Sequence, residues 1–227
     1  MATQLGFDLP MRPALGRADF MVAPSNALAL SMIEGWQSWP LRKLVLTGPD
    51  GSGKTHLTHV WATASGAHII AARDLDPDMV KADANRPLAV EDVPDIARNT
   101  TAQTTLFHLH NMQHAAGLPM LMTGTGAPSL WQMSLPDLQS RIDAAGHANL
   151  DAPDDKLLAA VLAKLFNDRQ LTPRPDVIPY LLTRMERSFD AAGRIVAALD
   201  SVSLARKRPV TRALAGEVLD NATGGGG

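Results

Sequence analysis

The pattern of hydrophobic and polar positions divides the chain into two parts. In the first part, short apolar runs alternate with longer stretches in which apolar residues recur at helical spacing. The runs that predict strands are Lys43 to Thr47, Ala67 to Ala71, Pro87 to Asp92, Pro119 to Thr123 and Ala145 to Leu150. Because such runs alternate with helical stretches, this part is expected to be α/β, with a parallel sheet and helical crossovers.

Helical periodicity is found in both parts. In the first part it predicts helices over Ser25 to Gln37, Lys54 to about Ser65, and Thr101 to Ala116. After Pro153 no strand pattern occurs, and the predicted helices are Asp154 to Gln170, Val177 to Met185, Ser188 to Arg206 and Thr211 to Asn221. The second part is therefore expected to be an all-α domain.

These patterns suggest four segments. Residues 1–16 are rich in proline and glycine and predict an extended arm. Residues 17–152 form the expected α/β domain and residues 153–221 the helical domain. Residues 222–227 end in a glycine tract, which predicts a disordered tail.

Composition narrows the class of protein. The 227 residues are 45% hydrophobic, which is enough for a sizeable core. The formal net charge of -2 favours neither nucleic acid nor an anionic membrane as a partner. The absence of cysteine excludes a disulfide framework and thiolate metal sites. No apolar run is long enough to span a bilayer, so we expect a cytoplasmic protein with no membrane association.

One glycine-rich loop carries the clearest chemical signal. The pattern G-x-x-x-x-G-K-[ST] of phosphate-binding loops is satisfied by Gly48, Pro49, Asp50, Gly51, Ser52, Gly53, Lys54 and Thr55. Backbone amides of such a loop surround the β-phosphate of a nucleotide, and the following helix adds its positive dipole end. Lys54 is expected to reach the β- and γ-phosphates, and the Thr55 hydroxyl to ligate Mg²⁺.

A second acidic site is expected at the end of another strand. Glu91 and Asp92 close an apolar run, so Glu91 is a candidate for the Mg²⁺ shell and Asp92 for orienting an attacking water. The alternative is a helix cap or a solvated loop.

Several segments together resemble the family of the bacterial replication initiator DnaA and its shorter Hda-like members. The matching segments are Asp19 to Asn26, Gly53 to Leu57, the acidic strand end, Phe107 to Asn111 ahead of Gly117-Leu118-Pro119, and Ser140-Arg141-Ile142. The resemblance implies an AAA+ P-loop NTPase core with a five-stranded parallel sheet, followed by a helical lid that closes on the nucleotide. It implies ATP or ADP with Mg²⁺ as the cofactors.

The resemblance also assigns residues to roles. Phe20, Val22 and Asn26 would line the adenine pocket, although an N-terminal staple and helix cap would explain them as well. His56 would contact the nucleotide directly after the loop. Arg141 corresponds to the arginine finger, which acts on a neighbouring subunit's nucleotide. A solvated arginine on a polar helix is the alternative.

Three departures from the family pattern predict weak ATP hydrolysis or a state that holds ADP. Glu91 stands where the family has aspartate, and the sensor position on the fourth strand falls on Thr125, whose hydroxyl can still bind phosphate or water. The lid arginine of the family aligns with Asp190, so Arg187 is expected to substitute for it.

The expected partners also follow from the resemblance. Because the sequence ends after the expected lid helices, we expect no sequence-specific DNA-binding domain. This favours an Hda-like regulator that stimulates ATP hydrolysis by DnaA in concert with the sliding clamp, the β subunit of DNA polymerase III. The arm resembles a clamp-binding segment, with contacts expected from Gln4, Leu5, Phe7 and Leu9. Incidental hydrophobic residues in a disordered arm are the alternative.

The oligomeric state and the function each leave an alternative open. Family members self-assemble through the face that carries the finger, so a homo-oligomer is possible. A different function, that of a stand-alone P-loop ATPase or a helicase-loader-like protein acting on single-stranded DNA, fits the same loop. The basic residues Arg206, Lys207, Arg208 and Arg212 are interpreted as a solvated helix end rather than a DNA contact.

Overall fold

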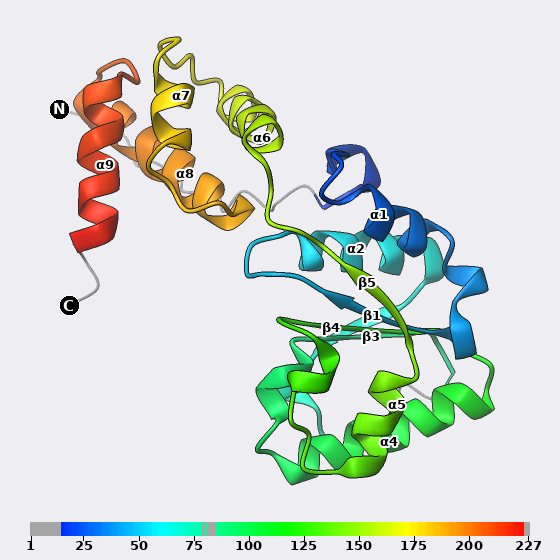
Figure 1. Cartoon of the computed structure of the whole chain (residues 1–227). Helices are drawn as coiled ribbons and strands as arrows, with labels where there is room; N and C mark the ends of the chain where they lie inside the picture. Colours follow the sequence, from blue (N-terminus) through cyan, green and yellow to red (C-terminus); the bar gives the residue numbers. More distant parts are fainter. Residues whose placement is uncertain (1–14, 79, 81–84, 225–227) are drawn as a thin grey trace, which may run out of the picture.

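The computed structural model describes residues 15–78, 80 and 85–224 of the chain. Its centre is a 5-stranded sheet in the order β2-β3-β4-β1-β5, and all neighbouring strands are parallel (Figure 1). The strands are β1 (Lys43–Thr47), β2 (His68–Ala71), β3 (Leu88–Glu91), β4 (Met120–Gly124) and β5 (Gly146–Asn149). The expected α/β class and five-stranded parallel sheet are confirmed.

Helices cover both faces of this sheet (Figure 1). Side chains alternate along β1, so Leu44 and Leu46 pack on the face that α1 and α2 cover, whereas Val45 packs on the face of α4 and α5. The helices are α1 (Ala27–Glu34), α2 (Lys54–Ser65), α4 (Thr100–Ala115) and α5 (Pro136–Asp143). Because both faces are covered, the central strands are buried throughout and appear in the sequence as continuous apolar runs.

The helices after β5 have a hydrophobic core of their own. They are α6 (Asp155–Asp168), α7 (Val177–Leu182), α8 (Phe189–Arg206) and α9 (Arg212–Gly224). Side-chain caps set two of the starts: the Asp154 carboxylate accepts a hydrogen bond from the Leu157 N–H at 2.8 Å, and the Ser188 hydroxyl accepts one from the Ala191 N–H at 3.1 Å. The helical part that the sequence predicts is thus present, and we call it the lid.

Both ends of the chain extend past the described residues. The candidate clamp-binding residues Gln4, Leu5, Phe7 and Leu9 lie outside them. At the other end, α9 continues beyond the expected end of the helix to Gly224, which is within the segment that was expected to be disordered. Over the described part of the chain, no helix has both the length and the apolarity to cross a bilayer.

Candidate nucleotide-binding site

The glycine-rich loop connects β1 to α2 at the carboxyl edge of the sheet, where parallel α/β folds bind their ligands. Gly51 and Gly53 have φ angles of 65° and 100°, which glycine adopts without strain. A Cβ added to Gly51 would lie 2.5 Å from the Cβ of Ser188, at the start of α8. The loop therefore needs glycine at this position both for its own conformation and for its close approach to the lid.

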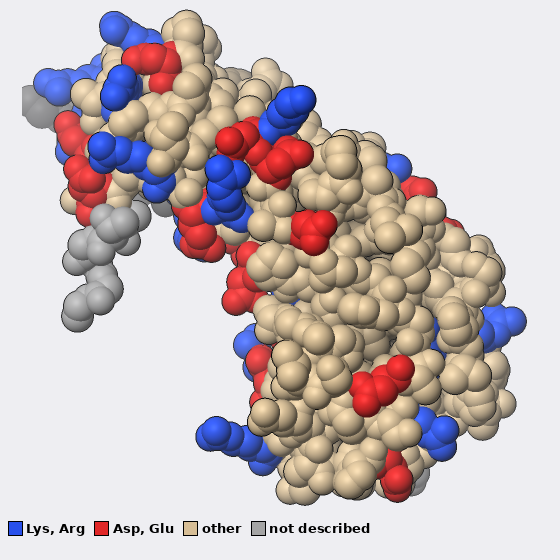
Figure 2. Space-filling view, viewed as in Figure 1, with Lys and Arg blue, Asp and Glu red and all other residues tan. Residues whose placement is uncertain are grey.

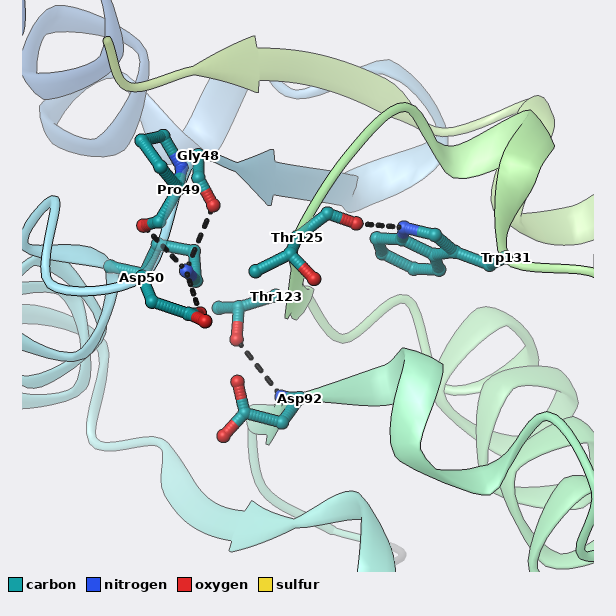
Figure 3. A network of polar contacts seen from close by, with 8 residues as sticks. Gly48, Pro49, Asp50, Asp92, Thr123, Thr125 and Trp131 are labelled. Carbon is teal, nitrogen blue, oxygen red and sulfur yellow. Dashed lines mark hydrogen bonds and ion pairs between the residues drawn. The ribbon is translucent and has the colours of Figure 1, made fainter. Parts of the chain in front are cut away.

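Lys54 lies inside this loop with its side chain almost fully buried. Its Nζ donates hydrogen bonds to the carbonyl oxygens of Gly48 and Pro49, at 2.9 and 3.0 Å (Figure 3). The carboxylate of Asp50 is 3.8 Å from the same Nζ. The hydroxyl of Ser52 is buried and has no hydrogen-bond partner among the described residues. An ammonium group and an unpaired hydroxyl thus lie where a phosphate would bind.

The structure brings the two predicted Mg²⁺ ligands together. Glu91 ends β3, and the side chain of Thr55, at the start of α2, lies near its carboxylate. Burial raises the pKa of Glu91 above its ordinary value, and the nearby Thr55 hydroxyl opposes this shift. Oε1 of Glu91 is buried without a partner among the described residues. A carboxylate oxygen left free beside a threonine hydroxyl is a donor set that suits Mg²⁺.

Asp92 follows Glu91 in a left-handed turn, with φ 55°. Its exposed side chain lines the cavity between the glycine-rich loop and the lid. Its N–H donates to the hydroxyl of Thr123 at 3.1 Å (Figure 3). Thr123 was not among the predicted site residues. Strand register could have identified it, because Val90 pairs with Met122 and the next positions in register are therefore Glu91 and Thr123.

Thr125, the predicted sensor, follows the last residue of β4 and is exposed. Its carbonyl accepts a hydrogen bond from the Trp131 indole at 2.8 Å (Figure 3). Thr125 is not among the residues that line the cavity. The threonine hydroxyl of this strand that contacts the acidic turn is that of Thr123.

A cavity of about 730 Å³ extends from the glycine-rich loop to the lid, within the usual size range of ligand pockets. Lys54, Thr55 and Asp92 contribute polar groups to its lining. Apolar side chains from the N-terminal segment and from α6 also line it, namely Phe20, Met21, Val161 and Leu165. Polar groups for phosphates and apolar side chains for a base match the two halves of a nucleotide.

His56 connects the loop to the N-terminal segment. Its Nε2 is 2.9 Å from the carbonyl oxygen of Gly16, and its ring packs edge-on against Phe20 with the centroids 5.1 Å apart. Both His56 and Phe20 line the cavity, and their contact with a nucleotide stays a prediction. Val22 and Asn26 do not line it. Asn26 instead organises the turn before α1, since its side chain donates to the Met21 carbonyl and accepts from the Ala23 N–H, each at 2.9 Å.

An ion pair joins the lid to the N-terminal segment beside the cavity. Nζ of Lys164, on α6, lies 3.2 Å from a carboxylate oxygen of Asp19 and 2.8 Å from one of Asp168. Hydrogen bonds to Asp168 and Asp19 raise the pKa of Lys164. All three residues line the cavity, so the ion pair connects two of the elements that form its wall.

The lid arginine that reaches the cavity differs from the predicted one. Arg187 precedes α8 and pairs with Asp155 at 2.7 Å, and it does not line the cavity. Asp190 and Arg194, one helical turn apart on α8, both line it. The sequence favours Arg187 as the lid arginine because it lies close to Asp190 along the chain. The start of α8 at Phe189 decides that Arg194 shares the face of Asp190, so Arg194 replaces Arg187 as the candidate.

Arg141 lies away from this cavity. It is an exposed residue of α5, on the face of the sheet opposite to α2, and it does not line the cavity (Figure 1). Among the described residues it forms no ion pair. An arginine finger for a neighbouring molecule requires such an exposed, uncommitted side chain, and this role stays a prediction.

The environment of Glu91 leads to a pH-dependent prediction. A carboxyl whose pKa is raised by folding stabilises the fold only while it is protonated, and that stability is lost as the pH rises through the raised pKa. Glu91→Gln should therefore increase the melting temperature at neutral pH and abolish the Mg²⁺ dependence of nucleotide binding. The gain should shrink as the pH falls below the pKa of Glu91.

Thermal melts across pH and nucleotide titrations with and without Mg²⁺ measure both effects. Glu34→Gln, at an exposed carboxyl on α1, is the matched control and should leave the metal dependence unchanged. A Glu91→Gln variant that melts lower than the native protein at neutral pH would contradict this account of the site.

Comparisons with known proteins identify relatives of this chain. No family model matches it. The chain is 25% identical over 228 residues to the chromosomal replication initiator DnaA of Cutibacterium acnes, covering 88% of this chain and 45% of that protein. It thus spans about half the length of the curated relatives that it matches.

Solved structures of the replication initiator DnaA share the fold of this chain. Domain III of the Thermotoga maritima initiator DnaA superposes with a TM-score of 0.81 at 19% identity, over 94% of this chain and 98% of that one. AMPPCP-bound DnaA from Aquifex aeolicus superposes with a TM-score of 0.68 at 17% identity, over 85% and 66%. Both comparisons agree with the resemblance found in the sequence: the chain is similar in sequence to the replication initiator DnaA and has the fold of DnaA domain III.

Proposed function

We propose that this protein binds ATP or ADP with Mg²⁺ and acts in the cytoplasm as an Hda-like regulator of replication initiation. Its partners in this role are DnaA and the DNA polymerase III sliding clamp. The proposal rests on the positions of the cavity and of Arg141. The chain has a nucleotide-sized cavity, whereas Arg141 is exposed on α5, which contributes no residue to the lining of that cavity. This arrangement suits a protein that holds a nucleotide itself and supplies a catalytic arginine to another molecule.

The residues of the cavity have distinct roles in this proposal. Loop amides and Lys54 hold the phosphates, and Asp92 orients water near the terminal phosphate. Thr55 and Glu91 would hold Mg²⁺, which neutralises phosphate charge when bound. Phe20 provides an apolar wall for the base.

Several features favour at most a weak ATPase activity. Asp50, Asp92 and Asp190 line the cavity, and their carboxylates would oppose the negative charge that develops on phosphate in hydrolysis. Burial raises the pKa of Glu91, so its charged form depends on a cation bound beside it. We expect a nucleotide to serve mainly as a structural ligand that holds the lid against the loop.

Direct contacts between lid and loop support this structural role. The Phe189 N–H donates to the Gly51 carbonyl at 2.8 Å, and the Phe189 ring lies near Gly53. A phosphate bound in the loop would therefore affect the start of α8, and through α8 the rest of the lid.

Arg194 is expected to distinguish a triphosphate from a diphosphate, because it lies on the α8 face that lines the cavity. Its guanidinium is only weakly engaged, at 3.7 Å from Glu186, and is available to a terminal phosphate. Arg194→Ala should weaken ATP binding about tenfold with little change for ADP, as expected for the loss of one charge-assisted hydrogen bond. Arg187→Ala removes the same charge outside the cavity and should change neither affinity. Calorimetric titration of both variants gives the comparison, and equal losses for ATP and ADP would refute the assignment.

The proposed function is tested by measuring hydrolysis by DnaA-ATP with and without this protein, in the presence of the clamp on DNA. Stimulation that depends on the clamp supports the regulator. Gln4→Ala combined with Leu5→Ala should reduce that stimulation if residues 1–16 bind the clamp. A protein that binds nucleotide but leaves DnaA unaffected, and remains on single-stranded DNA at physiological salt, would instead be the helicase-loader-like ATPase.

A further inference from the structure

Figure 2 shows several basic side chains, with acidic ones among them, over the end of the lid that α7 and α9 form. Two connections meet there, because the Arg174 N–H donates to the Val210 carbonyl at 3.0 Å. This bond joins the segment before α7 to the segment before α9. We call the resulting cluster the basic lid patch, and it consists of Arg174, Arg184, Lys207, Arg208 and Arg212.

An aromatic ring organises two of these arginines. The guanidinium carbons of Arg184 and Arg212 lie 5.3 and 4.8 Å from the centroid of the Tyr180 ring. Stacking on an aromatic face orders a guanidinium without occupying its N–H donors, which lie in its plane and stay available to oxygen acceptors. The two arginines are thus held in place before any ligand arrives.

The members of the patch are not held in ion pairs. Among the described residues, none of the five forms one. The nearby Arg206 is paired with Glu217 and is therefore not counted in the patch. Asp176 is the one carboxylate on the short connection between Arg174 and α7, and by itself it does not balance five cations.

The chemistry of the patch favours phosphate. Four of its members are arginines, whose planar forks bind phosphate oxygens in pairs, and Lys207 has a left-handed backbone that ends α8. We propose that the basic lid patch binds the phosphate backbone of nucleic acid without reading its sequence. This proposal does not depend on the nucleotide cavity, and it differs from the interpretation of Arg206 to Arg212 as a solvated helix end.

The test is fluorescence anisotropy of the full chain with a labelled single-stranded oligonucleotide and with a duplex of equal length, across a salt series. Arg184→Ala combined with Arg212→Ala removes the stacked pair. Arg73→Ala combined with Lys156→Ala removes the same charge from exposed positions elsewhere and is the matched control. The circular dichroism spectrum and the melting temperature, measured on each variant, verify that the fold is intact.

The native protein should bind with an affinity that falls steeply with salt, and the patch variant should bind about tenfold or more weakly with a salt slope lower by about two. The control variant should keep the native slope. Arg184→Lys combined with Arg212→Lys keeps the charge but loses the planar forks, and should bind both nucleic acids more tightly than the alanine variant and more weakly than the native protein. Equal losses in the patch and control variants, no binding at physiological salt, or displacement of DNA by poly-glutamate as effectively as by unlabelled DNA would overturn the proposal.

Discussion

Arg141→Ala is expected to abolish the stimulation of DnaA-ATP hydrolysis while leaving nucleotide binding by this protein unchanged. An arginine finger accelerates phosphoryl transfer by a factor of about 10³ or more, because its fixed guanidinium neutralises charge that develops on the γ-phosphate. Arg141 is exposed on α5 and lies outside the chain's own cavity, so its loss should not affect that site. Single-turnover hydrolysis of ATP on DnaA is the measurement.

Two further variants make this result specific. Arg141→Lys keeps the charge but loses the planar fork, and should recover only a small part of the stimulation. Arg42→Ala removes an exposed arginine before β1 and should leave the stimulation of DnaA-ATP hydrolysis unchanged. If Arg141→Ala stimulates DnaA as well as the native protein does, the role of α5 as a donor of a catalytic residue is wrong, even if nucleotide binding by the cavity is correct.

Lys54→Ala is expected to reduce the affinity for ATP and ADP on the order of 100-fold, since charge-assisted hydrogen bonds contribute up to about 3 kcal/mol each. The ammonium group already lies within the loop, bonded to the Gly48 and Pro49 carbonyls, so little side-chain ordering is needed when phosphate binds. Isothermal calorimetry with each nucleotide measures the loss.

The control for this variant separates lost binding from a damaged loop. Removing Lys54 leaves two loop carbonyls without their donor, which also lowers stability. Asp50→Asn retains the lysine and removes a carboxylate from the cavity, so it should bind nucleotide at least as tightly as the native protein. Native affinity in the Lys54→Ala variant would remove the basis for a nucleotide site in this loop.

The fold could be predicted from local sequence features, and so could the residues at the centre of the candidate site. β1 and α2 begin and end at the predicted residues, because a buried central strand is a continuous apolar run and the loop glycines mark the helix start. Glu91 was identified as a site residue because an acidic residue at the end of an apolar run stands out. α5 was harder to predict, since it is short and mostly polar, with Leu138 and Ile142 as its buried residues.

Contacts between distant elements could not be predicted in this way. Arg187 and Arg194 are both arginines close to Asp190, and only the start of α8 and its packing against the loop decide which of them faces the cavity. Thr123 and Thr125 are likewise both threonines at one strand end, and strand pairing decides which hydroxyl contacts the acidic turn. Asn26 was expected at the base, whereas its hydrogen bonds organise the turn before α1.

By itself, the sequence determined the layered α/β architecture, the helical lid and the phosphate loop, because these depend on periodicity and on glycine within a few residues. Only the tertiary structure decided which side chains share the cavity and which cations gather beside Tyr180. The physical reason is that a residue's neighbours across a cavity or on a surface are set by helix rotation and strand register. These are fixed by packing over the whole chain and not by the adjacent residues.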